Sequence, residues 1–477
     1  MINIIVIPID NRPVCYDLIR DTLSVDKNVN VLLPPIDFLG DLTHMAKIDE
    51  ILLWLDNTKN IDVVVASLDT IAYGGLINSR RSNDDFHIIK NRVDKFVQIA
   101  KKHHAKVYAF SSIMRISNNN INEEEKDYWN KFGKLIFKYS KTVHRLVFDN
   151  NPILKKELEL LRTKIPKHIL KDYLQTRIRN FNINKYYLSL QKNNIFETLI
   201  FSLDDCSQYG LNIFEASKLE EKSNLYQNVY IKTGADEIPF ILISKAYVDI
   251  VNQKRKLKFA IRYADNNSID KISKYEDKPV CKSISDAIIL SGCEVVKENE
   301  NFDLILFVNN FTNEQGELVM NVFEPSSGFK IDLNQINKPF FVVDILNANG
   351  ADFDFVKNNK DIFSHKNFLG YSAWNTTSNS VGSALALATI TYIAENKNIQ
   401  SFIKVQTVRL LDDWVYQSYL RQKLRANEKN LNTETLTKEM EKFHPTIEQM
   451  LNCKLKNIEY SYPWNRFFEI RVKVGLN

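Results

Sequence analysis

Short runs of consecutive apolar and β-branched residues recur along this chain, and longer stretches of helical character separate them. Strands that are apolar on successive residues are buried on both faces, which is typical of parallel sheets covered by helices. Regular alternation of such strands with helices indicates βα units. The sequence therefore predicts an α/β fold with a largely parallel, buried sheet. The predicted strands are Asn3–Pro8, Asn30–Leu33, Ile61–Ser67, Lys106–Ser111, Thr198–Leu203, Asn228–Lys232, Lys258–Tyr263, Asp303–Val308 and Phe340–Asp344.

The predicted architecture is a (β/α) barrel-like core of largely parallel strands over residues 1–395, followed by a helical C-terminal region over 396–477. The alternative is a doubly wound sheet with a second α/β subdomain, because the two predicted strands after residue 300 can belong to a separate sheet. A helical insertion is expected over about 118–190, which is rich in Asn, Glu and Lys. The polar connector at about 264–283 is a candidate subdomain boundary.

Composition and charge indicate a folded protein and argue against a nucleic-acid-binding or membrane protein. Of the 477 residues, 44% are hydrophobic and 25% are charged, which is ordinary for a folded protein. The net charge of +5 is too small over this length to indicate nucleic acid or a membrane surface as a partner. The five cysteines form no close pair, and no apolar run approaches the ~20 residues that span a bilayer. We therefore expect a cytoplasmic protein.

Polar residues collect directly after several predicted strands. Asp10, Asp69, Arg115, Asp204 and Asp236 all stand at this position. The carboxyl ends of the strands in an α/β fold face the same side, and ligands bind among the loops that follow them. We expect one shared pocket, lined by the loops that carry Asp10, Asp69, Arg115, Asp204, Asp205, Asp236 and Trp374.

Two adjacent carboxylates, Asp204 and Asp205, are the strongest catalytic candidates. In one pocket, mutual repulsion and burial would raise the pKa of one of them, so that the pair supplies an acid and an anion together. The structural alternative is a helix cap, in which one Asp accepts backbone N–H bonds and the other faces solvent. Asp236 is a further acid or base candidate. Its neighbour Glu237 is a substrate-binding candidate, or a first-turn acid that complements a helix dipole.

Other residues near the strand ends have the chemistry that binds a polar substrate. Asp10 and Arg12 can hold a hydroxyl and an anionic group, or can brace their own turn as an ion pair. Tyr73 beside two glycines is suited to stacking on a ring, and Asp69 to binding hydroxyls. The binding candidates are Asp10, Arg12, Asp69, Tyr73, Arg115, Tyr209, Glu237, Trp374 and Asn375.

The segment 370–384 is rich in small hydroxyl and amide side chains and precedes a predicted helix, Ala384–Ala394. The N-terminus of that helix offers N–H donors to a polar or anionic ligand group. Trp374 would form a stacking wall beside it, with Asn375 as a hydrogen-bonding group. Alternatively, Gly382 and the alanines that follow serve close packing of the helix on the sheet. Both interpretations can hold together.

The sequence has no GxGxxG, Walker, GxSxG, HExxH or EF-hand pattern. We therefore expect no cofactor. A Mg²⁺ or Mn²⁺ site built from Asp10, Asp69, Asp204 and Asp236 is the alternative, because both ions prefer oxygen ligands.

Seven motifs follow one another along nearly the whole chain: IPIDNRP, SLDTIAYGGL, FSSIMRIS, SLDDCSQYG, TGADE, NANGAD and AWNTTSNSVG. With this ordered set the chain resembles an uncharacterised bacterial family, domain of unknown function 4127. Ser111-Ser112 departs from the more amide-like pair expected there, and Leu203 stands where Gln is commoner. The resemblance implies no reaction, so the expected chemistry rests on the residues.

The favoured function is hydrolysis of a glycoside or related carbohydrate processing, with a small molecule or an oligosaccharide as substrate. Carboxylates supply acid and base groups, aromatic rings pack on sugar faces, and amides bind hydroxyls. Asp204-Asp205 is also similar to the adjacent acids of substrate-assisted N-acetylhexosaminidases, in which one acid orients the acetamido group and the next protonates the leaving oxygen. The alternatives are a metal-dependent hydrolase of a phosphate ester or amide, and a non-enzymatic protein that binds a sugar or nucleotide. The oligomeric state is left open.

Overall fold

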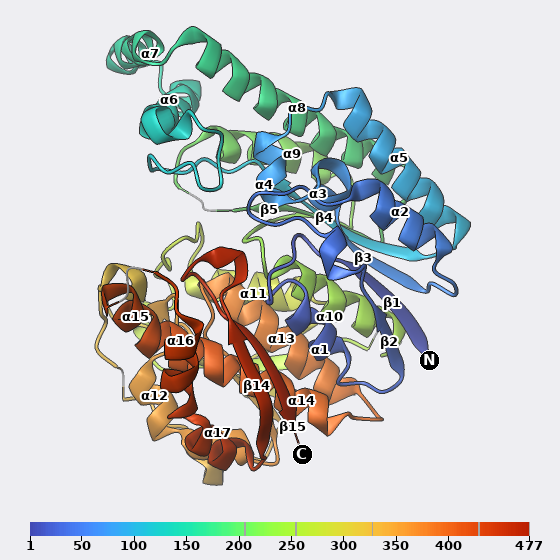
Figure 1. The fold of residues 1–477 in the computed structure, drawn as a ribbon, viewed down its shortest axis with the longest axis vertical. Helices are drawn as coiled ribbons and strands as arrows, with labels where there is room; N and C mark the ends of the chain where they lie inside the picture. Colours follow the sequence, from blue (N-terminus) through green and yellow to red (C-terminus); the bar gives the residue numbers. More distant parts are fainter. Residues whose placement is uncertain (205–206, 253–254, 327, 428–429, 477) are drawn as a thin grey trace. The chain divides into compact units, whose positions relative to one another are not determined.

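The computed structural model describes residues 1–204, 207–252, 255–326, 328–427 and 430–476. The chain forms two compact units, and Figure 1 labels most of the helices and some of the strands. Unit 1 consists of Met1–Ile2, Arg12–Val31 and Pro239–Asn477. Unit 2 consists of Asn3–Asn11 and Leu32–Ile238. Neither unit is therefore one continuous piece of chain.

The first sheet has the strand order β2-β1-β3-β4-β5-β6, and its strands β3 to β6 lie in unit 2. The pairs β1–β3, β3–β4, β4–β5 and β5–β6 are parallel. The order changes direction between β1 and β3, so this is a doubly wound sheet with its topological switch point between those strands. The strands are β1 (Ile2–Ile7), β2 (Val29–Leu32), β3 (Val63–Ser67), β4 (Lys106–Ile113), β5 (Thr198–Leu203) and β6 (Val229–Thr233).

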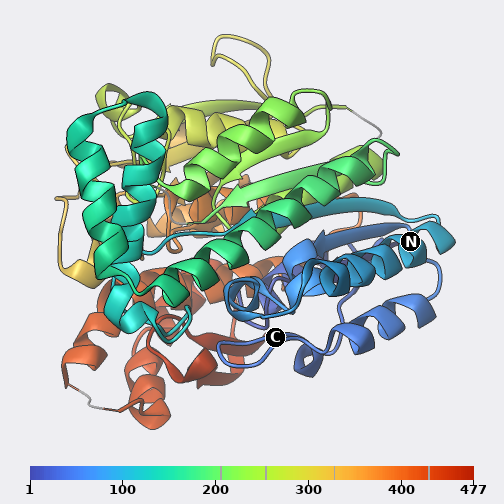
Figure 2. The ribbon, with the colours of Figure 1, turned by 90° about the horizontal axis from the view of Figure 1, so that it is seen from above.

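The connections from β2 to β6 all move the chain in one direction across this sheet. Right-handed crossovers of that kind place their helices on one face. The crossover helices are α2 (Ile48–Asn57), α5 (Phe86–Lys102), α8 (Lys167–Gln191) and α9 (Leu211–Ser223). α2 packs on α5, α5 on α8 and α8 on α9 (Figure 2). The face that they cover is thereby excluded from water, as the unbroken apolar strands predict.

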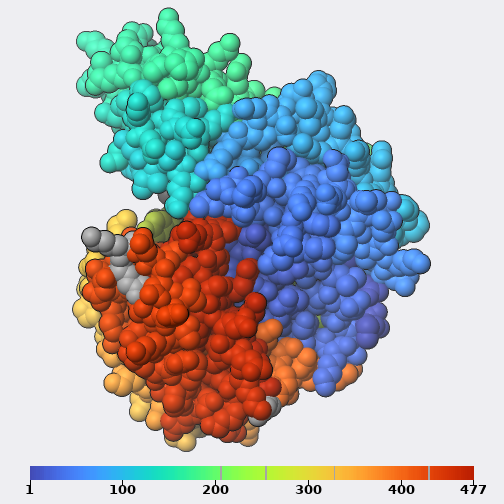
Figure 3. Space-filling model, viewed as in Figure 1, coloured from blue at the N-terminus to red at the C-terminus, as the bar shows by residue number. Residues whose placement is uncertain are grey.

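The helical insertion expected over about 118–190 is present between β4 and β5. It consists of α6 (Trp129–Phe148), α7 (Pro152–Lys164) and α8. α6 packs on α7, and both reach the surface of unit 2 in Figure 3. Trp129 and Tyr139 are buried in the apolar cluster of this insertion together with Tyr173 of α8, so aromatic side chains form much of its core.

Unit 1 is built on a second sheet with the order β13-β11-β9-β7-β8. All four of its strand pairs are parallel. In this sheet β8 lies on one side of β7, and β9, β11 and β13 follow on the other side. The first sheet has the same arrangement, with β2 on one side of β1 and the later strands on the other. The switch point of this sheet is therefore between β7 and β9. The strands are β7 (Lys258–Tyr263), β8 (Glu294–Val295), β9 (Leu304–Asn309), β11 (Phe340–Asp344) and β13 (Phe368–Ser372).

Helices from distant parts of the chain complete unit 1. α13 (Thr377–Ile393) packs on β11 and β13, and α11 (Val280–Leu290) packs on α13. α1 (Asp17–Leu23) packs on α13 and on α14 (Ile399–Arg409).

The segment after α14 covers part of unit 1. It forms a π-helix, η6 (Leu410–Leu420), then short helices, and ends in the antiparallel hairpin β14 (Leu455–Ser461) and β15 (Arg471–Leu476). Figure 3 shows this segment in red at the surface. The region expected to be helical over 396–477 is thus helical as far as Leu451 and then extended.

The expected barrel-like core is wrong, and the doubly wound alternative with a second α/β subdomain is correct. A barrel requires the first and last strands of one sheet to pair. Among the described residues β2 and β6 are the edges of one open sheet, and β8 and β13 are the edges of the other. The predicted core 1–395 extends over both units, and the connector at 264–283 lies inside unit 1, where it follows β7 and includes the first turn of α11. None of the described helices combines the length and hydropathy that a bilayer-spanning segment requires.

Candidate functional site

A cluster of ion pairs lies at the carboxyl ends of β4 and β5 in unit 2. The strand register pairs Ile113 with Leu203, so Arg115 and Asp204 emerge side by side. Nη1 of Arg115 donates to Oδ2 of Asp204 at 3.2 Å. Nη1 of Arg80, from α4 (Leu76–Arg81), lies 3.8 Å from the same oxygen. Two of the predicted site residues, Arg115 and Asp204, are therefore in direct contact.

Two glutamates from the loop after β4 complete this ion-pair cluster. Nη2 of Arg115 donates to Glu124 at 2.7 Å, and Nε of Arg115 donates to Glu125 at 3.3 Å. Nε of Arg80 lies 3.6 Å from Glu125, and the Arg80 side chain is only 1% exposed. Among the described residues, two guanidinium groups thus face the three carboxylates of Glu124, Glu125 and Asp204. Arg81 also interacts electrostatically with Glu124 and Glu125, so three guanidinium groups lie near these three carboxylates.

Asp69 lies in the first turn of α3 (Leu68–Tyr73) and is fully buried. Its carboxyl accepts hydrogen bonds from the Ser112 backbone N–H at 2.8 Å and from the Ser111 hydroxyl at 3.3 Å. Burial raises its pKa to about 6, because the charged form loses its hydration. The contacts tie α3 to the end of β4. In this structure Asp69 therefore positions the strand ends, and its carboxyl touches protein groups.

We expect Asp69 to make the stability of the protein depend on pH. Its pKa is about 6 in the folded protein, against an ordinary value of 3.8. Between these values the folded state holds the proton more tightly, so the free energy of unfolding falls as the pH rises from about 4 to about 6. For this one group the total fall is on the order of 3 kcal/mol.

Asp69→Asn should remove that part of the pH dependence. Urea denaturation of the wild type and the variant, compared at pH values between about 4 and 7, measures the difference. The gap between their unfolding free energies should change steadily across this range. A gap that stays constant would show that Asp69 does not titrate there.

The loop after β6 lies beside the end of β5. The Gly234 N–H donates to the Leu203 carbonyl at 2.8 Å, which brings the Asp236 loop next to the strand that ends at Asp204. Gly234 has a φ of +111°, and a Cβ at this position would lie 1.7 Å from Oε1 of Glu237. Only glycine fits at position 234, because the Glu237 carboxylate occupies the space that a Cβ would need.

Asp10 stands at the switch point of the first sheet. β1 and β3 pair Ile7 with Ala66, so Asp10 and Asp69 each come three residues after a paired position. The hydroxyl of Thr70 donates to the Pro8 carbonyl at 2.6 Å and fixes the start of α3 against the loop of Asp10. The side chain of Asp10 is buried.

A groove of about 890 Å³ borders the ion-pair cluster and includes Glu125 in its lining. Its lining mixes amides and carboxylates with the cationic side chains of Arg81 and Lys126 and with apolar groups, and Tyr128 is an aromatic member. Asp172 organises one wall, because it accepts hydrogen bonds from Lys126 at 2.8 Å and from the Tyr128 hydroxyl at 2.9 Å. Pockets of this size accommodate extended small ligands.

Comparison with protein families adds to this geometry. The family model described as protein of unknown function (DUF4127) matches residues 4–473. The chain belongs to this family. No curated protein and no solved structure matches it. The resemblance inferred from the seven motifs is therefore confirmed, and DUF4127 brings no reaction with it.

Two aromatic candidates of the DUF4127 chain also lie in unit 2. Tyr73 is buried, and the Arg179 guanidinium covers its ring at 5.4 Å from the centroid. Tyr209 is partly exposed and packs edge-on against His144, with ring centroids 5.6 Å apart. Tyr209 thus keeps surface for a ligand, whereas the ring of Tyr73 is already covered. The remaining catalytic candidate, Asp205, lies outside the described residues.

Arg12, Trp374 and Asn375 belong to unit 1. The Arg12 guanidinium lies over the ring of Trp464 at 5.1 Å. Trp374 is 2% exposed and packs edge-on against Phe468, so it contributes to the core of unit 1 and forms no open stacking wall there. The Asn375 carbonyl accepts a hydrogen bond from the backbone of a neighbouring loop at 2.6 Å.

The predicted anion site at the start of α13 is filled by the protein itself. The helix begins at Thr377, seven residues before the predicted start at Ala384. The backbone N–H and the hydroxyl of Ser378 both donate to the carboxylate of Glu276 at 2.8 Å. An internal carboxylate thus takes the place expected for a ligand anion.

Sequence reasoning missed Arg80, Glu124 and Glu125 as members of the site. Arg80 comes from a helix after the paired glycines, and the glutamates belong to a charged run typical of a solvated surface. The local signal for Arg80 was the pair Arg80-Arg81, which follows the paired glycines after the third predicted strand. Among the described residues, no group of three or more His, Cys, Asp or Glu side chains is arranged to hold a metal ion.

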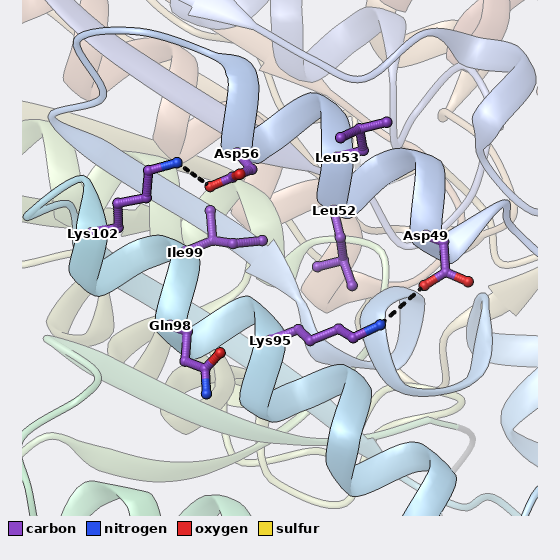
Figure 4. A pocket seen from close by; sticks show the side chains of 8 residues that line it. All are labelled: Asp49, Leu52, Leu53, Asp56, Lys95, Gln98, Ile99 and Lys102. Carbon is purple, nitrogen blue, oxygen red and sulfur yellow. Dashed lines mark hydrogen bonds and ion pairs between the residues drawn. The ribbon is translucent and has the colours of Figure 1, made fainter.

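A second hollow of unit 2, of about 430 Å³, lies between α2 and α5 (Figure 4). Ion pairs from Lys102 to Asp56 at 2.6 Å and from Lys95 to Asp49 at 3.6 Å join the two helices across it. Its described lining contains no member of the ion-pair cluster and no predicted site residue. We therefore leave it outside the candidate site.

Proposed function

We propose that this DUF4127 protein is a hydrolase that processes a carbohydrate, in the manner of a glycosidase. The observation that carries the proposal is the parallel pairing of β5 with β6, which brings the loops of Asp204 and Asp236 together in unit 2. Glycoside hydrolysis uses two carboxyl groups that flank the scissile bond, one as acid and the other as base or nucleophile.

Asp204 takes the role of the charged carboxylate in this proposal. Its ion pairs with Arg115 and Arg80 fix its orientation, and its side chain is 18% exposed, so a substrate can reach it. A carboxylate held in this way stabilises positive charge that develops on a sugar ring. Asp236 transfers the proton, and Asp205 is the alternative acid.

The groove beside the cluster supports a hydroxylated substrate. Its amides and carboxylates are hydrogen-bonding partners for sugar hydroxyls, and its volume of about 890 Å³ suits more than one sugar ring. We further propose a cytoplasmic protein that needs no metal cofactor and uses neither nucleic acid nor a membrane as partner.

A substrate panel tests this proposal. The purified protein is incubated with nitrophenyl glycosides of both anomers and with nitrophenyl phosphate, each with and without a chelator. We expect release of nitrophenol from at least one glycoside, unchanged by the chelator. Release from the phosphate alone, lost with chelator and restored by Mg²⁺ or Mn²⁺, would overturn the proposal in favour of a metal-dependent hydrolase. Sugar binding without any hydrolysis would favour a binding protein.

A further inference from the structure

A hollow of about 360 Å³ lies in unit 1 at the switch point of its sheet. It is lined by Tyr263 at the end of β7, by Phe307 of β9 and by Glu298 from the loop after β8. In doubly wound sheets the connections after the strands diverge at the switch point and leave a crevice, where ligands bind. The strand order accounts for the part of the lining at and after the ends of β7 and β8, and the connector before β11 supplies the rest, from Phe329 to Gln335.

Arg262 forms a planar platform in this hollow. Its guanidinium lies 5.6 Å from the centroid of the Phe307 ring. Nε donates to Oε1 of Glu298 at 2.7 Å, and Nη2 donates to the same oxygen. These contacts fix the plane of the guanidinium, while its side chain remains 32% exposed. A fixed guanidinium plane stacks well on a flat ring.

Phe329 supplies a second aromatic surface to the lining. Its ring is stacked on Phe355 at a centroid distance of 6.2 Å and an interplanar angle of 9°. It also lies 6.4 Å from the ring of Phe307. The aromatic part of the hollow is thus already ordered, which lowers the entropy cost of binding a rigid ring.

Polar groups in the lining can form hydrogen bonds with the edge of a flat ring that stacks on Arg262. The amides of Asn266 and Gln335 each offer a donor and an acceptor.

The charges in the lining are balanced. Arg262 and Lys330 are matched by Glu298 and Asp332, and Arg262 is already paired with Glu298. This balance gives no preference for a phosphate or a carboxylate.

We propose that this hollow binds a planar, uncharged heterocycle of the nucleobase or nucleoside type, stacked on the Arg262 guanidinium with its polar edge on the amides. This site is separate from the proposed carbohydrate chemistry. Its described lining lies entirely in unit 1, whereas Asp204 and Asp236 lie in unit 2.

Binding of adenosine and uridine to the full chain, measured by isothermal titration calorimetry, tests the proposal. Ribose and inorganic phosphate serve as probes for the sugar and for an anion. We expect saturable binding of at least one nucleoside, and no saturable binding of ribose or phosphate at the same concentrations. Absence of nucleoside binding would overturn the proposal, and tighter binding of phosphate would overturn the ligand class.

Two variants locate the binding in this hollow. Arg262→Lys keeps the charge but removes the planar platform, and it should weaken binding of the nucleoside about 10-fold, since stacking on one base contributes about 1–3 kcal/mol. Phe329→Leu should weaken it similarly. Phe323→Leu, at a side chain that is 68% exposed and outside the lining, is the matched control. Circular dichroism checks folding, and unchanged binding in both test variants would place the ligand elsewhere.

Discussion

Asp204→Asn should lower kcat/KM for glycoside hydrolysis by about 10²- to 10⁴-fold, the usual contribution of one positioned acid, base or nucleophile. The substitution keeps the shape of the side chain but removes the negative charge that faces Arg115 and Arg80. The loss should be the same for activated aryl glycosides and for unactivated ones, because a charged carboxylate is needed whichever group departs. Steady-state kinetics on both substrate classes measures this, after circular dichroism has confirmed folding.

The proton donor should behave differently. Asp236→Asn or Asp205→Asn, whichever removes the general acid, should spare activated aryl glycosides, because a good leaving group needs little protonation. Asp56→Asn is a matched control, since Asp56 pairs with Lys102 outside the candidate site. If Asp204→Asn retains a near-wild-type rate on a confirmed substrate, Asp204 has only a structural part in the cluster.

Glu215→Ala should lower the free energy of unfolding by about 3–5 kcal/mol. Glu215 of α9 accepts two hydrogen bonds from Arg177 of α8, from Nε at 2.9 Å and from Nη2 at 2.6 Å. The Arg177 side chain is only 2% exposed, so the substitution leaves a guanidinium buried without this counter-charge. Urea denaturation followed by circular dichroism measures the loss.

Two further variants separate this effect from general damage to α9. Glu221→Ala removes an exposed carboxylate that pairs with Lys218, and it should change stability by no more than about 0.5 kcal/mol. Replacing both partners, as Arg177→Met with Glu215→Leu, should recover much of the loss, because no uncompensated charge remains. A loss below about 1 kcal/mol for Glu215→Ala would mean that water reaches Arg177 and solvates it.

The strand pattern of the sequence predicted which segments are strands but not which of them pair. All nine predicted strands are present, because consecutive apolar residues report burial on both faces. Pairing depends on contacts between distant segments, so one barrel and two open sheets share the same local pattern. β13 escaped prediction, and it carries Gly370 at a φ of +152°, a residue that weakens a strand pattern.

The sequence predicted those site residues that directly follow a strand. Arg115 and Asp204 were found in this way, because the loops after parallel strands converge. Arg80, Glu124 and Glu125 enter from a helix and a charged loop, whose local sequence is typical of solvent-exposed surface. Trp374 is the opposite case, because the polar residues around it bond internally, as the Ser380 hydroxyl does to the Trp374 carbonyl at 3.0 Å.

Unit 1 combines a segment before residue 32 with the chain after residue 238, and this determines the order in which the two units can fold during synthesis. Asp17 of α1 pairs with Arg471 of β15 at 3.0 Å, across 454 residues of sequence. The strands β3 to β6 of unit 2 are all complete once residue 233 has been synthesised. α1 must wait for partners made more than 350 residues later, in α13 and α14. We therefore expect unit 2 to fold first during translation, and unit 1 to close only after α13 and α14 have been synthesised, with α1 exposed to chaperones and proteases in the meantime.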